Sequence, residues 1–312
     1  MRVPLPAAMM TTFNAMRKSF SFRCRRTLII GLASTLVAIL LGGCSALRLA
    51  YDQGPMVTRW WLDSYLDFSD AQEPLVRLAV ASWFDWHRST QLTDYAQLLQ
   101  RAQSEVMAPV QPEQVCRWGE EMRLRVDRAL ERALPLAVEA ARSLNTKQVD
   151  HLEAKYAKKN ADYRKDFLQP KLEDRQEASL ERAIDRAQTL YGRLDPAQKR
   201  WLAGQLKSVP FDAQAWYQQR TSQQQDIVRT LRQLVADRPD RERTLAMLNG
   251  LKQKWTFARR ADASAQEQRV WQANCEWMAE LHNSTTLSQR QHARDKLKGW
   301  EEDVRALAAS RR

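Results

Sequence analysis

The stretch Val110-Gln111-Pro112-Glu113-Gln114 is followed by apolar residues at helical spacing, and together they predict a long helix. An apolar residue, a polar capping residue, two variable residues and Gln form a helix start, because Gln at the third helical position reaches back to the cap. Pro112 suits the first helical position, and Pro135 is expected to kink or shorten the helix. The stripe that we expect in the core comprises Val115, Trp118, Met122, Val126, Ala129, Ala133 and Leu136.

The same pattern predicts four further helix starts. They are Phe68-Ser69-Asp70-Ala71-Gln72, Leu144-Asn145-Thr146-Lys147-Gln148, Leu194-Asp195-Pro196-Ala197-Gln198 and Leu287-Ser288-Gln289-Arg290-Gln291. Their uneven intervals exclude a solenoid of fixed period. The apolar spacing then predicts helices near 56–67, 70–88, 94–107, 112–143, 146–168, 171–191, 196–207, 212–236, 240–282 and 289–309, with a break allowed around Asp262.

The composition indicates an all-α protein. The chain has only 9 glycines in 312 residues, whereas sheets and phosphate-binding loops use glycine for tight turns. Long helices joined by short links stack antiparallel, so we expect an elongated multi-helix bundle or a layered helical body.

The N-terminal segment has the features of an export signal. Residues 28–43 are apolar but short for a membrane span, and they follow Arg17, Lys18, Arg23, Arg25 and Arg26. Leu41-Gly42-Gly43-Cys44 resembles a bacterial lipobox, which implies acylation of Cys44 and cleavage before it. Ser45 in place of Asp implies sorting to the outer membrane, facing the periplasm. We therefore expect a signal peptide over 1–43, starting at Met1 or Met16, a lipidated tether over 44–55 and a helical periplasmic domain over 56–312.

Much of the net positive charge lies in the N-terminal segment. The full sequence carries a formal charge of +12, but residues 1–43 hold six Lys or Arg and no acid. Their removal leaves about +6, which is weak evidence for any partner. Nucleic acid is not expected outside the cytoplasm, whereas anionic lipid lies close to any anchored protein.

Two cysteines remain after processing, Cys116 and Cys275. In an oxidising compartment they are candidate disulfide partners. The alternative is that Cys275 acts as a small buried hydrophobe, because it shares a helical stripe with Trp271, Met278 and Leu281.

No catalytic motif is found in the sequence. The histidines show no metal-ligand spacing, and there is no nucleophile elbow, phosphate loop or Cys-x-x-Cys motif. We therefore expect no cofactor, no metal and no enzymatic activity, although an enzyme built on dispersed carboxylates would escape this search.

Two segments are candidate binding sites. The first is rich in aromatic rings with polar neighbours and comprises Trp60, Trp61, Asp63, Tyr65, Asp67, Phe68, Trp83, Phe84, Asp85, Trp86, His87, Arg88 and Tyr95. It suits a ligand pocket or a filled core, and Trp60 and Trp61 also suit a lipid interface. The second comprises Lys252, Lys254, Trp255, Phe257, Arg259 and Arg260, which suit an anionic head group, an acidic client or a solvated helix face.

Together with the lipobox, the tracts 47–51, 60–68 and 83–88 make the chain resemble an uncharacterised family of proteobacterial helical lipoproteins, defined by a domain of unknown function. That resemblance implies location and architecture but no catalytic residue. The helix starts are also similar, more weakly, to the Leu-Thr-x-x-Gln signatures of ATP-independent periplasmic chaperones.

These features lead to three hypotheses of function. The first is a non-enzymatic, outer-membrane-anchored lipoprotein that binds an unidentified envelope protein or anionic lipid. The second is a chaperone that holds unfolded clients. The third is a hydrolase of envelope polymers that uses Asp63, Asp67, Asp85 or His87.

Overall fold

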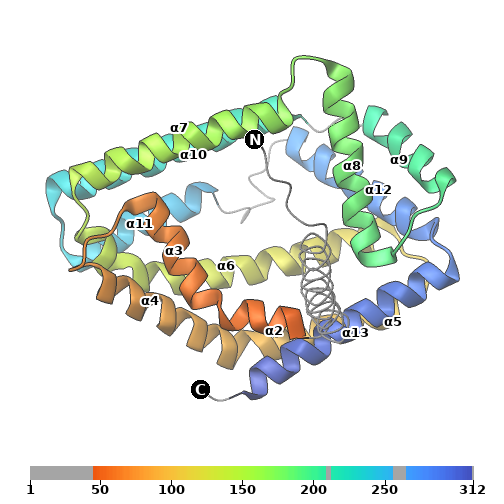
Figure 1. Ribbon diagram of the computed structural model, residues 1–312, viewed down its shortest axis with the longest axis horizontal. Helices are drawn as coiled ribbons and strands as arrows, with labels where there is room; N and C mark the ends of the chain where they lie inside the picture. The colour runs from red at the N-terminus through yellow and green to blue at the C-terminus, as the bar shows by residue number, and fades with distance from the viewer. Residues whose placement is uncertain (1–44, 209–211, 256–264, 311–312) are drawn as a thin grey trace, which may run out of the picture. The chain divides into compact units, whose positions relative to one another are not determined.

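The computed structural model describes residues 45–208, 212–255 and 265–310 (Figure 1). Every regular element in these ranges is helical, which confirms the prediction of an all-α fold. The α-helices are α2 (Ser45–Asp52), α3 (Gly54–Leu66), α4 (Glu73–Trp86), α5 (Leu92–Glu105), α6 (Pro112–Arg142), α7 (Thr146–Phe167), α8 (Leu172–Tyr191), α9 (Pro196–Ser208), α10 (Ala213–Asp237), α11 (Arg241–Trp255), α12 (Ala265–Asn283) and α13 (Leu287–Ala309). A short π-helix, η1 (His87–Gln91), joins α4 to α5.

The chain divides into two compact units, Met1–Leu49 and Ala50–Arg312. In the first unit the structure describes only residues 45–49, which are helical. The tether expected over 44–55 differs from the structure, because α2 covers most of it and because Tyr51 and Asp52 already belong to the second unit. The Tyr51 hydroxyl lies 2.8 Å from His87 Nδ1, and Asp52 forms an ion pair of 2.8 Å with Arg88. The folded body therefore begins before residue 56.

Helix starts follow the predicted capping chemistry at two of the five motifs. At α7, Asn145 and Gln148 form a complete capping box. Ahead of α9, Gln198 N–H donates to Asp195 Oδ1 at 2.8 Å, and Asp195 N–H donates to Gln198 Oε1 at 3.0 Å. Each box satisfies backbone N–H groups that the first turn of a helix leaves without partners.

The other three motifs differ in detail. Gln111 caps α6 in an extended conformation, but its side chain makes no capping hydrogen bond. Ser69 begins a turn, and α4 starts only at Glu73. The prediction for Ser288 was wrong by two residues, because Thr286 and Gln289 form the capping box of α13.

One other helix boundary also differs from expectation. The helices expected over 70–88 and 94–107 are continuous through η1. The described parts of the segment 240–282 form two helices, α11 and α12, which agrees with the break that the sequence allowed, and Asp262 itself lies outside the described residues. Pro135 does not shorten α6, which continues past it to Arg142.

The described core consists of several local clusters between neighbouring helices. The largest joins α6, α7, α10 and α11 and includes Val138, Val149 and Leu234. Smaller clusters lie between α5 and α13, between α6 and α12, and among α8, α9 and α12. Helices α7 and α10 run side by side, and α5 packs along α13 (Figure 1). None of the described helices is long and apolar enough to cross a membrane.

The stripe predicted for α6 is only partly in the core. Val115 is buried, but Met122 and Val126 keep 50% and 49% of their surface exposed. The expectation that the whole stripe is core was therefore wrong. Helical spacing shows which face of a helix is apolar, but not whether another element covers that face.

Candidate functional site

The aromatic segment of α4 and η1 is organised around His87, which is 8% exposed. The Trp83 ring stacks on its imidazole, with the ring centres 4.8 Å apart. The Tyr51 hydroxyl lies 2.8 Å from Nδ1 and the Tyr95 hydroxyl 3.3 Å from Nε2, so both ring nitrogens have tyrosine partners. Burial lowers the pKa of His87 to about 4 and raises the pKa of Tyr51 to about 12. Burial also raises the pKa of Tyr95. The imidazole of His87 and the hydroxyls of Tyr51 and Tyr95 are therefore neutral near pH 7.

Residues beside His87 also have internal partners. Trp83 Nε1–H donates to the Ala129 carbonyl at 2.9 Å, which ties α4 to α6. The Arg88 guanidinium donates to the Leu307 carbonyl at 3.0 Å and pairs with Asp52. Trp86 packs near the Trp83 ring, at 6.2 Å between ring centres. This part of the segment is a filled core, as one of the sequence interpretations proposed.

The candidate carboxylates take separate structural roles. Asp63 Oδ1 accepts the Phe68 N–H at 3.0 Å and so stabilises the turn after α3. Asp67 has a positive φ of 48°, and its carbonyl oxygen accepts a hydrogen bond from Gln148. Asp85 is exposed on α4. Among the described residues, no group of three or more His, Cys, Asp or Glu could hold a metal ion.

Trp60 and Trp61 lie on the solvent-exposed part of α3, with 71% and 51% of their surface exposed. They are therefore separate from the filled core around Trp83. The aromatic segment that the sequence presents as one cluster forms two different environments.

The basic-aromatic cluster is described only in part. Lys252 pairs with Glu131 at 2.6 Å, and Lys254 lies 3.8 Å from Asp226, so these two lysines have acidic neighbours. Trp255 ends α11, but its side chain lies outside the described residues, as do Phe257, Arg259 and Arg260.

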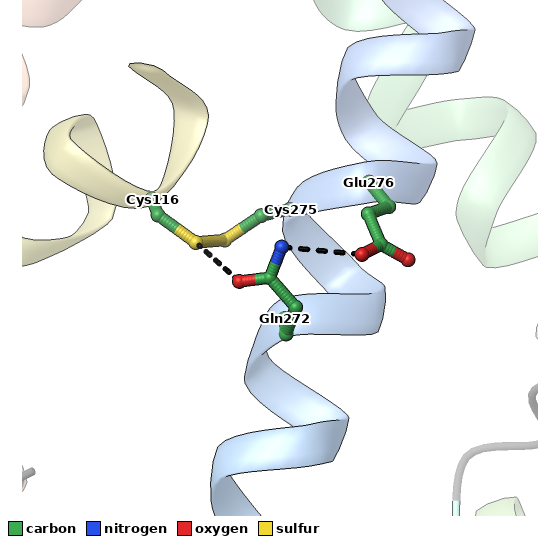
Figure 2. Close-up of a disulfide and its surroundings, with 4 residues drawn as sticks. All are labelled: Cys116, Gln272, Cys275 and Glu276. Carbon is green, nitrogen blue, oxygen red and sulfur yellow. Dashed lines mark hydrogen bonds between the residues drawn. A yellow bond between two sulfur atoms is a disulfide. The ribbon is translucent and has the colours of Figure 1, made fainter. Parts of the chain in front are cut away.

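Cys116 on α6 and Cys275 on α12 form a disulfide, with their Cα atoms 5.4 Å apart (Figure 2). Gln272 lies beside the bond: its Oε1 is 3.9 Å from Cys116 Sγ, and its Nε2 donates to Glu276 at 3.1 Å. The bond joins two residues that are 159 positions apart, and Cys275 is itself 3% exposed. The disulfide and burial of Cys275 thus occur together.

Sequence reasoning missed a second buried histidine site. His282 Nε2–H donates to the Ala108 carbonyl at 2.9 Å, and its Nδ1 accepts from the Tyr191 hydroxyl at 2.9 Å. Burial lowers the pKa of His282 below its usual value. No spacing rule connects residues 191 and 282, so only the folded chain shows the pair.

A shallow depression of about 260 Å³ lies where α6 and α10 end, lined by Leu75, Glu139, Arg142, Ser143, Leu234, Arg238 and Pro239. Its lining contains none of the residues that the sequence singled out.

Comparison with known proteins gives one match. Residues 64–260 match the profile of a family described as a family of unknown function, DUF6279. No curated protein and no solved structure gives a significant match. Because the matched segment covers more than half of the sequence, the chain belongs to this family of unknown function, DUF6279.

Proposed function

We propose that this protein is a lipoprotein, anchored in the outer membrane through Cys44, that binds envelope components on the periplasmic side. The observation that carries the proposal is the disulfide between Cys116 and Cys275. Such bonds persist outside the cytoplasm, where thiols are not kept reduced. The export signal and the sequence Leu41-Gly42-Gly43-Cys44 support the same location.

Binding is favoured over catalysis by the way in which the candidate groups are used. His87, Trp83 and Arg88 are satisfied by partners within the protein. By contrast, apolar side chains of α3 and α6 are open to solvent, and exposed apolar faces are typical of interaction surfaces. We therefore propose a non-enzymatic role with an envelope protein or anionic lipid as partner.

The exposed apolar side chains of α6 favour a chaperone-like function as the second candidate. Met122, Val126 and Leu130 lie at intervals of four residues, so they follow one face of the helix. Unfolded chains expose apolar segments that pack on such a face without any need for a shaped pocket. This function requires no nucleotide and no cofactor.

Localisation is tested with Cys44→Ala, using Cys24→Ala as the matched control because residue 24 lies inside the signal segment. We expect the Cys44→Ala protein to leave the membrane fraction and the Cys24→Ala protein to remain in it. An unmodified Cys44 in the parent protein, read by mass spectrometry, would contradict lipid anchorage.

Binding is tested with a photo-crosslinking amino acid at Val126 on α6, and with Glu302 on α13 as an exposed polar control. One dominant adduct in native envelopes, absent from the control, supports a dedicated partner. A series of unfolded outer-membrane proteins supports the chaperone instead. Equal labelling from both positions would contradict a binding role for this face of α6.

A further inference from the structure

Helix α3 carries an uncovered apolar face. Met56, Val57, Trp60 and Trp61 expose 54%, 51%, 71% and 51% of their surface. Met56 and Trp60 are one helical turn apart, as are Val57 and Trp61, so the four side chains form a continuous patch. We call these four residues the α3 patch.

The rest of α3 is held by the folded body. A Cβ at Gly54 would come within 2.5 Å of the Phe84 ring, so α4 approaches the helix closely there. Tyr65 and Leu66 pack against the largest core cluster. The α3 patch is therefore presented on a helix that is fixed at both of its ends.

The position of the patch in the sequence indicates what covers it. Met56 is only twelve residues after Cys44, and an extended chain of that length spans about 43 Å at most. The helical residues of α2 shorten this reach, because a helix rises only about 1.5 Å per residue. Acyl chains on Cys44 would hold the patch close to a bilayer.

The chemistry of the patch suits the bilayer surface. Tryptophan rings are enriched at the level of the lipid head groups, because the apolar part of the ring contacts the acyl chains while the N–H stays hydrogen-bonded to water. Trp61 lies 4.9 Å from the Tyr65 ring, and Lys155 Nζ lies 5.4 Å from the centre of the same tyrosine ring. A cation beside the aromatic patch favours anionic head groups. Asp63, which is exposed, limits the apolar face at its C-terminal end.

We propose that the α3 patch inserts into the head-group region of the bilayer that carries Cys44, as a second membrane contact; this inference rests on the proposed lipidation. One anchor point leaves a protein free to tilt and rotate, whereas a second contact fixes which surface faces the membrane. The α3 patch would thus set the orientation of the folded body.

The test uses the full acylated protein in vesicles of phosphatidylethanolamine and phosphatidylglycerol with brominated acyl chains, which quench tryptophans that reach the bilayer. We expect Trp60→Phe/Trp61→Phe to reduce the quenched signal at least threefold. Trp216→Phe is the control, because Trp216 is 45% exposed on α10, and it should leave the signal unchanged. Met56→Ser/Val57→Ser keeps every tryptophan and should halve the quenching. Circular dichroism checks that each variant is folded.

The outcomes separate this inference from the lipid anchor. If the acylated protein floats with the vesicles but Trp60→Phe/Trp61→Phe is quenched like the parent, the membrane contact is refuted and the anchor stands. If mass spectrometry finds no acyl chain, the proposed function fails, and quenching of the unacylated chain decides whether the patch binds lipid by itself. A dimer that the Trp60→Phe/Trp61→Phe change dissociates, without lipid quenching, would assign the patch to a second copy.

Discussion

The side-chain amides of Gln72 and Gln148 pair reciprocally although the residues are 76 positions apart. Gln148 Nε2 donates to Gln72 Oε1 at 2.7 Å, and Gln72 Nε2 donates to Gln148 Oε1 at 3.2 Å. The remaining donors reach backbone carbonyls, Asp67 at 2.9 Å and Ser143 at 2.7 Å. Both glutamines are buried, so each side-chain amide supplies hydrogen-bond partners that water would otherwise supply to the other.

Gln148 also closes the capping box of α7, whereas Gln72 closes the turn that precedes α4. Gln148 Oε1 accepts the Asn145 N–H at 3.1 Å, and Gln72 Oε1 accepts the Ser69 N–H at 2.9 Å. The local capping motif and the long-range contact therefore use the same amide groups. The cap of α7 is thus joined to the turn ahead of α4.

The same arrangement occurs a second time between α9 and α13. Gln198 and Gln289 exchange two hydrogen bonds, each of 2.9 Å. Their other donors reach the Ser284 carbonyl at 3.1 Å and the Arg193 carbonyl at 2.9 Å. The capping-box glutamines Gln148, Gln198 and Gln289 thus connect elements as well as capping helices.

Gln148→Glu should destabilise the protein by about 3 kcal/mol at pH 8, because it removes two buried hydrogen-bond donations and places a charge there. The deficit should shrink as the pH falls, because burial raises the pKa of the new carboxyl group and its protonated form donates one hydrogen bond. Urea unfolding at pH 8 and pH 5 measures both effects.

The control for this variant is Gln219→Glu on the exposed face of α10. It makes the same chemical change without burial, so its effect should stay within about 0.5 kcal/mol. Equal losses for the two variants would show that the buried pair contributes nothing beyond helix formation.

The Cys116–Cys275 bond joins residues 159 positions apart, and for a loop of that size the chain-entropy model gives about 5 kcal/mol as an upper figure. We expect Cys116→Ser/Cys275→Ser to lose about 2–5 kcal/mol in denaturant unfolding. Dithiothreitol should bring the parent protein to the same midpoint as the double variant and leave the double variant unchanged. An effect of the reductant on the variant would mean that the bond is not the cause.

His87 should make stability depend on pH. Its pKa falls from 6.5 to about 4 on folding, so the unfolded chain binds the proton first as the pH drops. The contribution of His87 to the free energy of unfolding is complete above about pH 6.5. It is lost between pH 6.5 and pH 4, by about 3 kcal/mol in total. An NMR titration of the imidazole resonance, assigned through its absence in His87→Phe, measures the folded pKa. A value near 6.5 would refute the buried neutral state.

The fold was predictable where local chemistry decides it. Asn145 and Gln148 identify the start of α7 because capping acts over three residues. At α13 the sequence offers two overlapping choices, Thr286 with Gln289 and Ser288 with Gln291, and spacing alone did not separate them. The two Gln pairs were not predictable, because nothing local shows which caps meet.

The candidate site was less predictable for the same reason. The sequence placed Trp60 and Trp83 in one aromatic segment. In the structure Trp60 is exposed, whereas the Trp83 Nε1–H donates to the Ala129 carbonyl. Tyr51 was assigned to a tether, so its contact with His87 was missed. Met122 was expected in the core, and whether a helix face is covered depends on distant elements.

Gly119 lies where α6 and α12 approach too closely for a side chain to fit without a shift. A Cβ there would come within 2.5 Å of the Trp271 ring, close to the disulfide that joins the same two helices. Gly119→Ala should therefore destabilise the protein by about 1–3 kcal/mol, because the indole must move.

Gly250 in α11 is the matched control, because its added Cβ would meet no atom within 4 Å. Gly250→Ala should stabilise the protein by about 0.5–1 kcal/mol, since alanine favours the helix and restricts the unfolded chain. The same Gly→Ala substitution is thus expected to change the free energy of unfolding, measured in guanidinium, with opposite signs in α6 and α11. If both variants gained stability, Trp271 would have room to move and the α6–α12 contact would be looser than the structure shows.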